Sequence, residues 1–223
     1  MKKIGHIIKH LFLFLIDETY FDTRTNFYST VSMIINFIWA FIKFTIGYIT
    51  HSFFFFVSAG YTLCIGICKQ IYLHGRKKEL QPSVEMNYVK NISIILLLAS
   101  FFYTIYMAKL FIWPENHKNY GLILSITLAL FAFVNFFISI RGLVKSRKKN
   151  DSLLLGLKTV KLATALTSIV LTQVCLLEAC SSGESLVDNS FYDALTGSIC
   201  GLICTILSIL LFTYALRKRK QLA

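Results

Sequence analysis

The side chains with which this protein could do chemistry are few, and their spacing matches no catalytic pattern. Its five histidines include no H-E-x-x-H pair, the spacing that holds zinc on a metalloprotease helix. Neither a G-x-S-x-G nucleophile motif nor a phosphate-binding P-loop is present. Acids or nucleophiles for a membrane enzyme acting on lipid cannot be assembled at one interface. We therefore expect no catalytic residues, no metal site and no cofactor.

Carboxylates carry protons or bind cations inside many membrane proteins. All eleven Asp and Glu of this chain fall outside its apolar stretches or at their edges, and Glu178 is expected to be the deepest. This distribution disfavours a proton- or sodium-coupled pump. It also disfavours an intramembrane aspartyl protease, which needs two buried carboxylates.

Four of the six cysteines form two pairs spaced four residues apart, Cys64 with Cys68 and Cys200 with Cys204. The C-x-x-x-C spacing is neither the C-x-x-C redox motif nor the usual spacing of a zinc site. Cysteine inside an apolar helix is mostly a small packing residue, so packing is the expected role. Metal or redox chemistry is the alternative.

Long apolar stretches are the elements that must position these side chains. The chain has 223 residues, of which 56% are hydrophobic, and its mean hydropathy is +0.64. Only 15% are charged, whereas soluble domains carry about 25%. A membrane-spanning helix needs about 20 apolar residues. Six stretches meet this requirement, at residues 28–49, 52–73, 91–113, 120–140, 158–178 and 194–216. We therefore expect an all-α integral membrane protein with one six-helix domain over residues 28–216.

Basic residues follow every second stretch, at 76–78, 141–149 and in the tail 217–223. The connection between the fifth and sixth stretches is acidic instead, with Glu184 and Asp188 among its charges. Lys and Arg mark cytoplasmic loops, so both termini are expected in the cytoplasm. The net charge of +12 then indicates anionic lipid headgroups as partners at the cytoplasmic face, and no nucleic acid. Frequent Ile, Phe, Lys and Asn suggest a low-GC bacterium and its plasma membrane.

The first 27 residues form a cytoplasmic segment in this prediction. Ile4, Ile8, Leu11 and Leu15 fall on one helical face, and Lys9 falls elsewhere. We expect residues 1–18 to form a short amphipathic helix on the membrane surface. It would serve as a simple anchor or, alternatively, as a docking helix for a partner.

The six spans are expected to pair as three hairpins, each of which goes out, turns and ends in basic residues. Repeated units of this kind occur in membrane transporters, with binding sites at the repeat interface. No residue-by-residue identity relates the three pairs, so a true internal repeat stays open. Both prolines, Pro82 and Pro114, are expected in loops.

Several lysines lie inside the expected spans or at their margins, namely Lys43, Lys69, Lys109 and Lys161. Each is within about two turns of an expected helix end. Their long stems are therefore expected to carry the ammonium groups to the lipid headgroups.

Lys158 and Lys161 are the expected exceptions, because residues three apart share a helix face. The same connection also supplies Arg141 and Lys145. Together these four residues predict a cytoplasmic pocket for an anionic headgroup or an anionic substrate.

Uncharged polar residues inside the spans predict either a substrate path or hydrogen bonds between helices. The candidates are Asn36, Asn135, Thr167 and Gln173. The span at 158–178 is the most polar, so it is expected to face the bundle interior. Gly197 and Gly201 form a small-x-x-x-small motif that predicts close helix packing, internal first and between copies second.

Two functions remain open at this stage. One is a small transporter or permease-type protein, either as a homodimer or as a permease subunit with a separate ATPase. The alternative is a non-catalytic accessory or regulatory protein that binds another membrane protein or anionic lipid.

Overall fold

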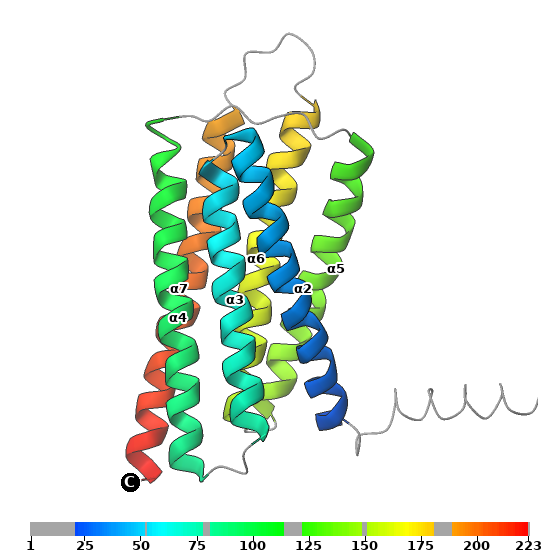
Figure 1. The fold of residues 1–223 in the computed structure, drawn as a ribbon. Coiled ribbons are helices and arrows are strands. Elements are labelled where there is room, and N and C mark those ends of the chain that lie inside the picture. Colours follow the sequence, from blue (N-terminus) through cyan, green and yellow to red (C-terminus); the bar gives the residue numbers. More distant parts are fainter. Residues whose placement is uncertain are drawn as a thin grey trace, which may run out of the picture.

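A computed structural model describes residues 21–51, 53–77, 81–113, 122–148, 151–180 and 189–222. All secondary-structure elements in this part of the chain are α-helices (Figure 1). The helices are α2 (Phe21–Thr50), α3 (Phe53–Lys77), α4 (Pro82–Lys109), α5 (Leu122–Lys148), α6 (Ser152–Cys180) and α7 (Asn189–Leu222). All six are long and apolar enough to cross a membrane. The chain is therefore an all-α multi-pass membrane protein, as predicted, while the expected amphipathic helix at 1–18 lies outside the described residues.

The helices extend beyond the apolar stretches that predicted them. α2 begins at Phe21 rather than at residue 28, so part of the expected N-terminal segment belongs to the first helix. α4 begins at Pro82, which was expected in a loop; proline is favoured in a first helical turn because its missing N–H is not needed there. An apolar stretch corresponds only to the part of a helix that lies in the hydrocarbon layer, whereas the helix itself continues until its backbone is capped.

Of the three expected hairpins, α2 with α3 and α6 with α7 are in contact, whereas α4 and α5 do not pack extensively on each other. α4 has its main contacts with α7 rather than with α5, and α5 packs against α6. The described helices instead form two rows, α2–α3–α4 and α5–α6–α7, which meet where α3 contacts α6 and α4 contacts α7. Figure 1 shows α4 and α7 at one side of the bundle and α5 at the other.

Small residues explain the close pairing of α4 and α7. A Cβ added at Gly197 would stand 2.5 Å from Met107 Sδ. One added at Gly201 would overlap Thr104 Oγ1 and stand 3.2 Å from Thr104 Cα. The glycines therefore let α7 approach the backbone of α4 more closely than any larger residue would allow. This contact lies within one chain.

α2 presents its polar and small side chains to the protein and its large apolar side chains outward. Ser29 and Ala40 are buried, whereas Phe41 is 73% and Phe27 61% exposed. This is the reverse of a soluble helix and fits a lipid-facing surface, because lipid solvates apolar side chains and leaves polar groups to find partners inside.

The two ends of the bundle differ in charge. We call the basic end the one formed by the last turns of α3, α5 and α7 and the first turns of α2, α4 and α6. It carries Arg76, Arg147 and Lys218. At the opposite end, α2 and α3 are joined by a turn in which His51 adopts a φ of 53°, and aromatic residues gather there. The rings of Phe53 and Tyr106 lie 5.4 Å apart, in keeping with an interfacial aromatic belt.

Candidate functional site

Lys69, on the inward face of α3, is the most deeply buried cation among the described residues. Its side chain is 2% exposed. The ammonium donates a hydrogen bond of 2.7 Å to Ser32 Oγ on α2. The ion pair recorded within the described residues joins Arg76 to Asp151, away from Lys69. Lys69 therefore places a cation inside the bundle with a neutral hydroxyl as its hydrogen-bond partner.

Lys161 of α6 interacts electrostatically with Lys69, and Lys158 of the same helix interacts with Lys161. Both interactions are repulsions between like charges. Lys158 runs along Gly142 of α5, where an added Cβ would stand 3.1 Å from Lys158 Cδ. Lys69, Lys161 and Lys158, which we call the lysine cluster, thus form a series of coupled lysines from α3 to the contact between α6 and α5.

The lysine cluster lies below the headgroup level of the basic end. Lys69 is roughly two turns, or about 12 Å, from the end of α3 at Lys77. Lys161 is at a similar depth from the beginning of α6 at Ser152.

Asn36 adds an available donor next to the cluster. It follows Ser32 by one turn on the same face of α2 and is 8% exposed. Its amide nitrogen is buried and has no hydrogen-bond partner among the described residues. Buried donors of this kind are rare unless a ligand or a water completes them. Further along the same seam, Lys43 donates bonds of 3.0 Å each to Ser58 Oγ and Thr62 Oγ1 of α3.

The residues expected to form an anion pocket are divided by the fold. Lys158 and Lys161 are half-buried inside the bundle, whereas Arg141 and Lys145 are exposed on α5. The expectation that lysines within the spans reach the headgroups is wrong for Lys69, which is buried.

Two further lysines bear on the same expectation. Lys43 bonds to hydroxyls of the neighbouring helix, so it too stays within the bundle. Lys109 is exposed and lies over the rings of Phe53 and Trp113. Sequence reasoning missed Lys69 and Lys43 because their partners are on another helix, and no spacing within α3 or α2 reveals them.

The four residues expected to line a polar path are not joined by hydrogen bonds in the described structure. Thr167 donates to carbonyls of its own helix, at Ala163 and Thr164. Gln173 donates to the Tyr192 carbonyl of α7 at 3.2 Å, and Asn135 is half-buried on α5. Of this set, Asn36 lies one turn from Ser32, the hydrogen-bond partner of Lys69.

Among the described residues, Asp193 is a buried carboxylate at one edge of its span. Asp193, in the first turns of α7, is 1% exposed and interacts electrostatically with Tyr103 of α4. It lies at the end of the bundle opposite the basic end, so it does not offset the charge of the lysine cluster.

The described cysteines form no disulfide among themselves, and two of them contact the backbone of a neighbouring helix. Cys68 Sγ lies 3.7 Å from the Ile92 carbonyl, and Cys204 Sγ lies 3.9 Å from the Ala163 carbonyl. Each bridges two helices as a weak donor. Within the described part of the chain, no group of three His, Cys, Asp or Glu could hold a metal ion.

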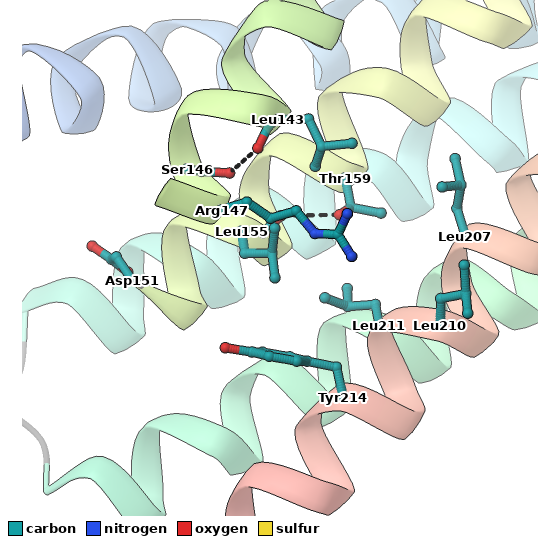
Figure 2. A pocket seen from close by; sticks show the side chains of 10 residues that line it. All are labelled: Leu143, Ser146, Arg147, Asp151, Leu155, Thr159, Leu207, Leu210, Leu211 and Tyr214. Atoms are coloured by element: carbon teal, nitrogen blue, oxygen red, sulfur yellow. Dashed lines mark hydrogen bonds between the residues drawn. The ribbon is translucent and has the colours of Figure 1, made fainter. Parts of the chain in front are cut away.

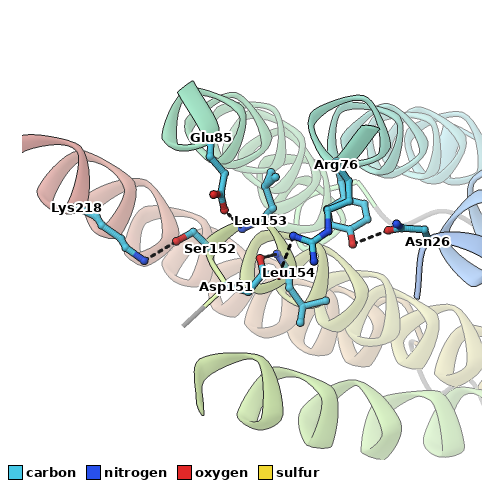
Figure 3. Close-up of polar contacts among 9 residues, drawn as sticks. Asn26, Arg76, Glu85, Asp151, Ser152, Leu153, Leu154 and Lys218 are labelled. Atoms are coloured by element: carbon cyan, nitrogen blue, oxygen red, sulfur yellow. Dashed lines mark hydrogen bonds and ion pairs between the residues drawn. The ribbon is translucent and has the colours of Figure 1, made fainter. Parts of the chain in front are cut away.

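The carboxylates at the basic end are engaged at the N-terminus of α6 (Figure 3). Asp151 Oδ1 accepts the Leu154 N–H at 2.9 Å, and Asp151 Oδ2 pairs with Arg76 of α3 at 3.0 Å. Glu85 of α4 accepts the Leu153 N–H at 3.1 Å. These contacts satisfy two N–H groups of the first turn and tie α6 to α3 and α4.

Lys218 of α7 completes this junction, donating to Ser152 Oγ at 2.8 Å and to the Tyr214 hydroxyl at 3.1 Å. The α6 N-terminus therefore belongs to the structure of the bundle.

No protein-family model matches this chain, and no curated protein sequence is significantly similar to it. What bears on its function is therefore the geometry of its own residues.

Proposed function

We propose that this protein is a small permease-type transporter, or the membrane subunit of one, whose substrate carries a negative charge. The observation that carries the proposal is the lysine cluster, with Lys69 buried among α2, α3 and α6 without a carboxylate partner. Ionisable residues inside a membrane protein are costly and mark substrate or ion pathways by default.

The chemistry of the cluster favours an anion with several acceptor oxygens. Burying an ammonium group without a counter-charge is strongly unfavourable, and a phosphate or carboxylate would offset that cost. The unpartnered amide nitrogen of Asn36 would supply a further donor to the same ligand. A free anion from the aqueous phase and a phospholipid headgroup share this chemistry.

The arrangement of the helices supports transport. Each row contains three helices, so the row α5–α6–α7 crosses the membrane in the opposite sense to α2–α3–α4. Many transporters are built from two inverted halves and bind substrate near the membrane midplane between them. The cluster draws Lys69 from one row and Lys161 and Lys158 from the other.

Orientation and partners follow from the same proposal. The basic end would face the cytoplasm, with both termini inside, in a bacterial plasma membrane. Transport would be driven either by a bound soluble ATPase or by assembly with a second copy. Anionic headgroups would surround the basic end.

The accessory function stays as a second candidate, because the polar residues of α6 do not line a continuous path. Thr164, Thr167 and Thr172 all donate to carbonyls of α6 itself. A protein that binds an anionic lipid or a membrane partner at the lysine cluster, without moving it across the membrane, would need no such path.

Anion-dependent stability tests the proposal. Wild type, Lys69→Gln and Lys77→Gln would be purified in a neutral detergent and melted with inorganic phosphate, pyrophosphate or phosphatidylglycerol. Lys77 is the matched control, since it is exposed at the end of the same helix. We expect an anion at 100 times its Kd to stabilise wild type and Lys77→Gln by about 2.7 kcal/mol. That stabilisation would raise Tm by several degrees, and Lys69→Gln should lose it.

The same proteins in liposomes separate the two candidate functions. Flux of labelled phosphate, or exchange of phosphatidylglycerol between leaflets, that depends on Lys69 would support transport of the corresponding anion. Binding without flux would support the accessory function. An anion response of Lys69→Gln equal to that of wild type would contradict both.

A further inference from the structure

A site with a charged end and apolar walls lies at the basic end, on the side of α6 away from Lys161. A pocket of about 340 Å³ is enclosed by α5, α6 and α7 (Figure 2). Arg147 and Tyr214 line the pocket nearer the basic end. Its apolar lining includes leucines of α5 and α7, namely Leu143, Leu207, Leu210 and Leu211. Figure 2 shows the Arg147 side chain reaching across the pocket toward α7.

The other polar groups of this pocket are engaged within the protein. Ser146 Oγ donates to the Leu143 carbonyl at 2.8 Å, and Thr159 Oγ1 donates to the Leu155 carbonyl at 3.0 Å. Asp151 is paired with Arg76 and caps α6. The guanidinium of Arg147 is therefore the charged group directed at an occupant, above walls that are apolar.

The pocket has the depth of a phospholipid in one leaflet. Arg147 and the basic residues after Arg217 mark the headgroup level. Leu207 lies on α7 about 15 Å below Arg217, within the hydrocarbon layer. Leu210 is 59% exposed, and α5 and α7 do not pack extensively on each other, so the pocket opens sideways toward lipid.

We infer that this pocket binds an anionic phospholipid of the leaflet at the basic end. The phosphate would pair with Arg147, whose fork of donors matches phosphate oxygens, and an acyl chain would lie along the leucine wall. A soluble anion would leave that wall uncovered. The site is separate from the lysine cluster and does not depend on the proposed transport.

Lipid retention measured by native mass spectrometry tests the inference. Protein would be extracted from liposomes of equal parts phosphatidylglycerol and phosphatidylcholine. The variants are Arg147→Gln, which removes the cation, and Leu210→Trp, which fills the pocket from its exposed side. Their controls are Arg219→Gln and Ile209→Trp, which are exposed on α7 outside the pocket.

We expect wild type and both controls to retain one phosphatidylglycerol in preference to phosphatidylcholine. Arg147→Gln should lower that retention about tenfold, since losing a hydrogen bond between charged groups weakens binding by about this factor. Leu210→Trp should lower retention of both lipids. Equal retention in wild type and Leu210→Trp, or no preference for phosphatidylglycerol in wild type, would overturn the inference.

Discussion

The charged residues in the half of the bundle at the basic end fall into two groups. Asp151 and Glu85 accept N–H groups at the start of α6, and Asp151 also pairs with Arg76. Lys69 and Lys161 are buried or half-buried without such partners. The carboxylates therefore stabilise the bundle, whereas Lys69 and Lys161 have no carboxylate partner among the described residues.

Asp151 allows its two roles to be measured separately. Asp151→Ala removes both the helix cap and the ion pair, and we expect it to lower the free energy of unfolding by about 1–2 kcal/mol. Asp151→Asn keeps a capping oxygen and should cost less, about 0.2–1 kcal/mol, because the pair with Arg76 is partly exposed. Unfolding in mixed detergent micelles measures both. Equal losses for the two variants would show that the cap contributes nothing.

The sequence identified the lysine pair on α6 but assigned Lys69 to the headgroup region. The i, i+3 spacing of Lys158 and Lys161 lies within one helix, so the sequence contains the whole signal. The burial of Lys69 depends on Ser32, which is 37 residues away on α2. Such a contact between helices follows from packing, and hydropathy carries no information about it.

At the scale of elements, the six spans were predictable, and their neighbours were predictable only in part. Apolar stretches of sufficient length indicate spanning helices because the bilayer leaves a backbone few other solutions. Hairpin pairing was inferred from chain order alone. α4 packs against α7 because Gly197 and Gly201 permit a close approach there, so packing surfaces rather than loop order determine the neighbours.

The α4–α7 contact gives a prediction with an internal control. Gly201→Ala should lower the free energy of unfolding by about 1–3 kcal/mol, because the added Cβ meets the backbone of Thr104 at 3.2 Å. Gly60→Ala on α3 has nothing within 4 Å and should stabilise by about 0.5–1 kcal/mol, through helix propensity alone. Thermal unfolding measures both. Gains of similar size in the two variants would contradict the close approach of α4 and α7.

At the scale of the whole molecule, the chain forms two rows of three helices with opposite directions across the membrane. Class and number of spans were readable from composition, and the basic residues predicted which ends lie together. The two-row arrangement was not readable, since no sequence identity relates the halves. The lysine cluster lies at the meeting of the rows, where α3 of one contacts α6 of the other.

An experimental map of the protein tests the central claim most directly, namely that the lysine cluster binds an anion. The full chain would be examined by electron cryomicroscopy in a nanodisc containing phosphatidylglycerol, with pyrophosphate in the buffer. We predict density for a phosphate group within about 4 Å of the ammonium groups of Lys69 and Lys161, the range of an ion pair. The Asn36 amide should lie beside it. A well-resolved map in which Lys69 contacts Ser32 alone, with no ligand density between α3 and α6, would contradict the claim.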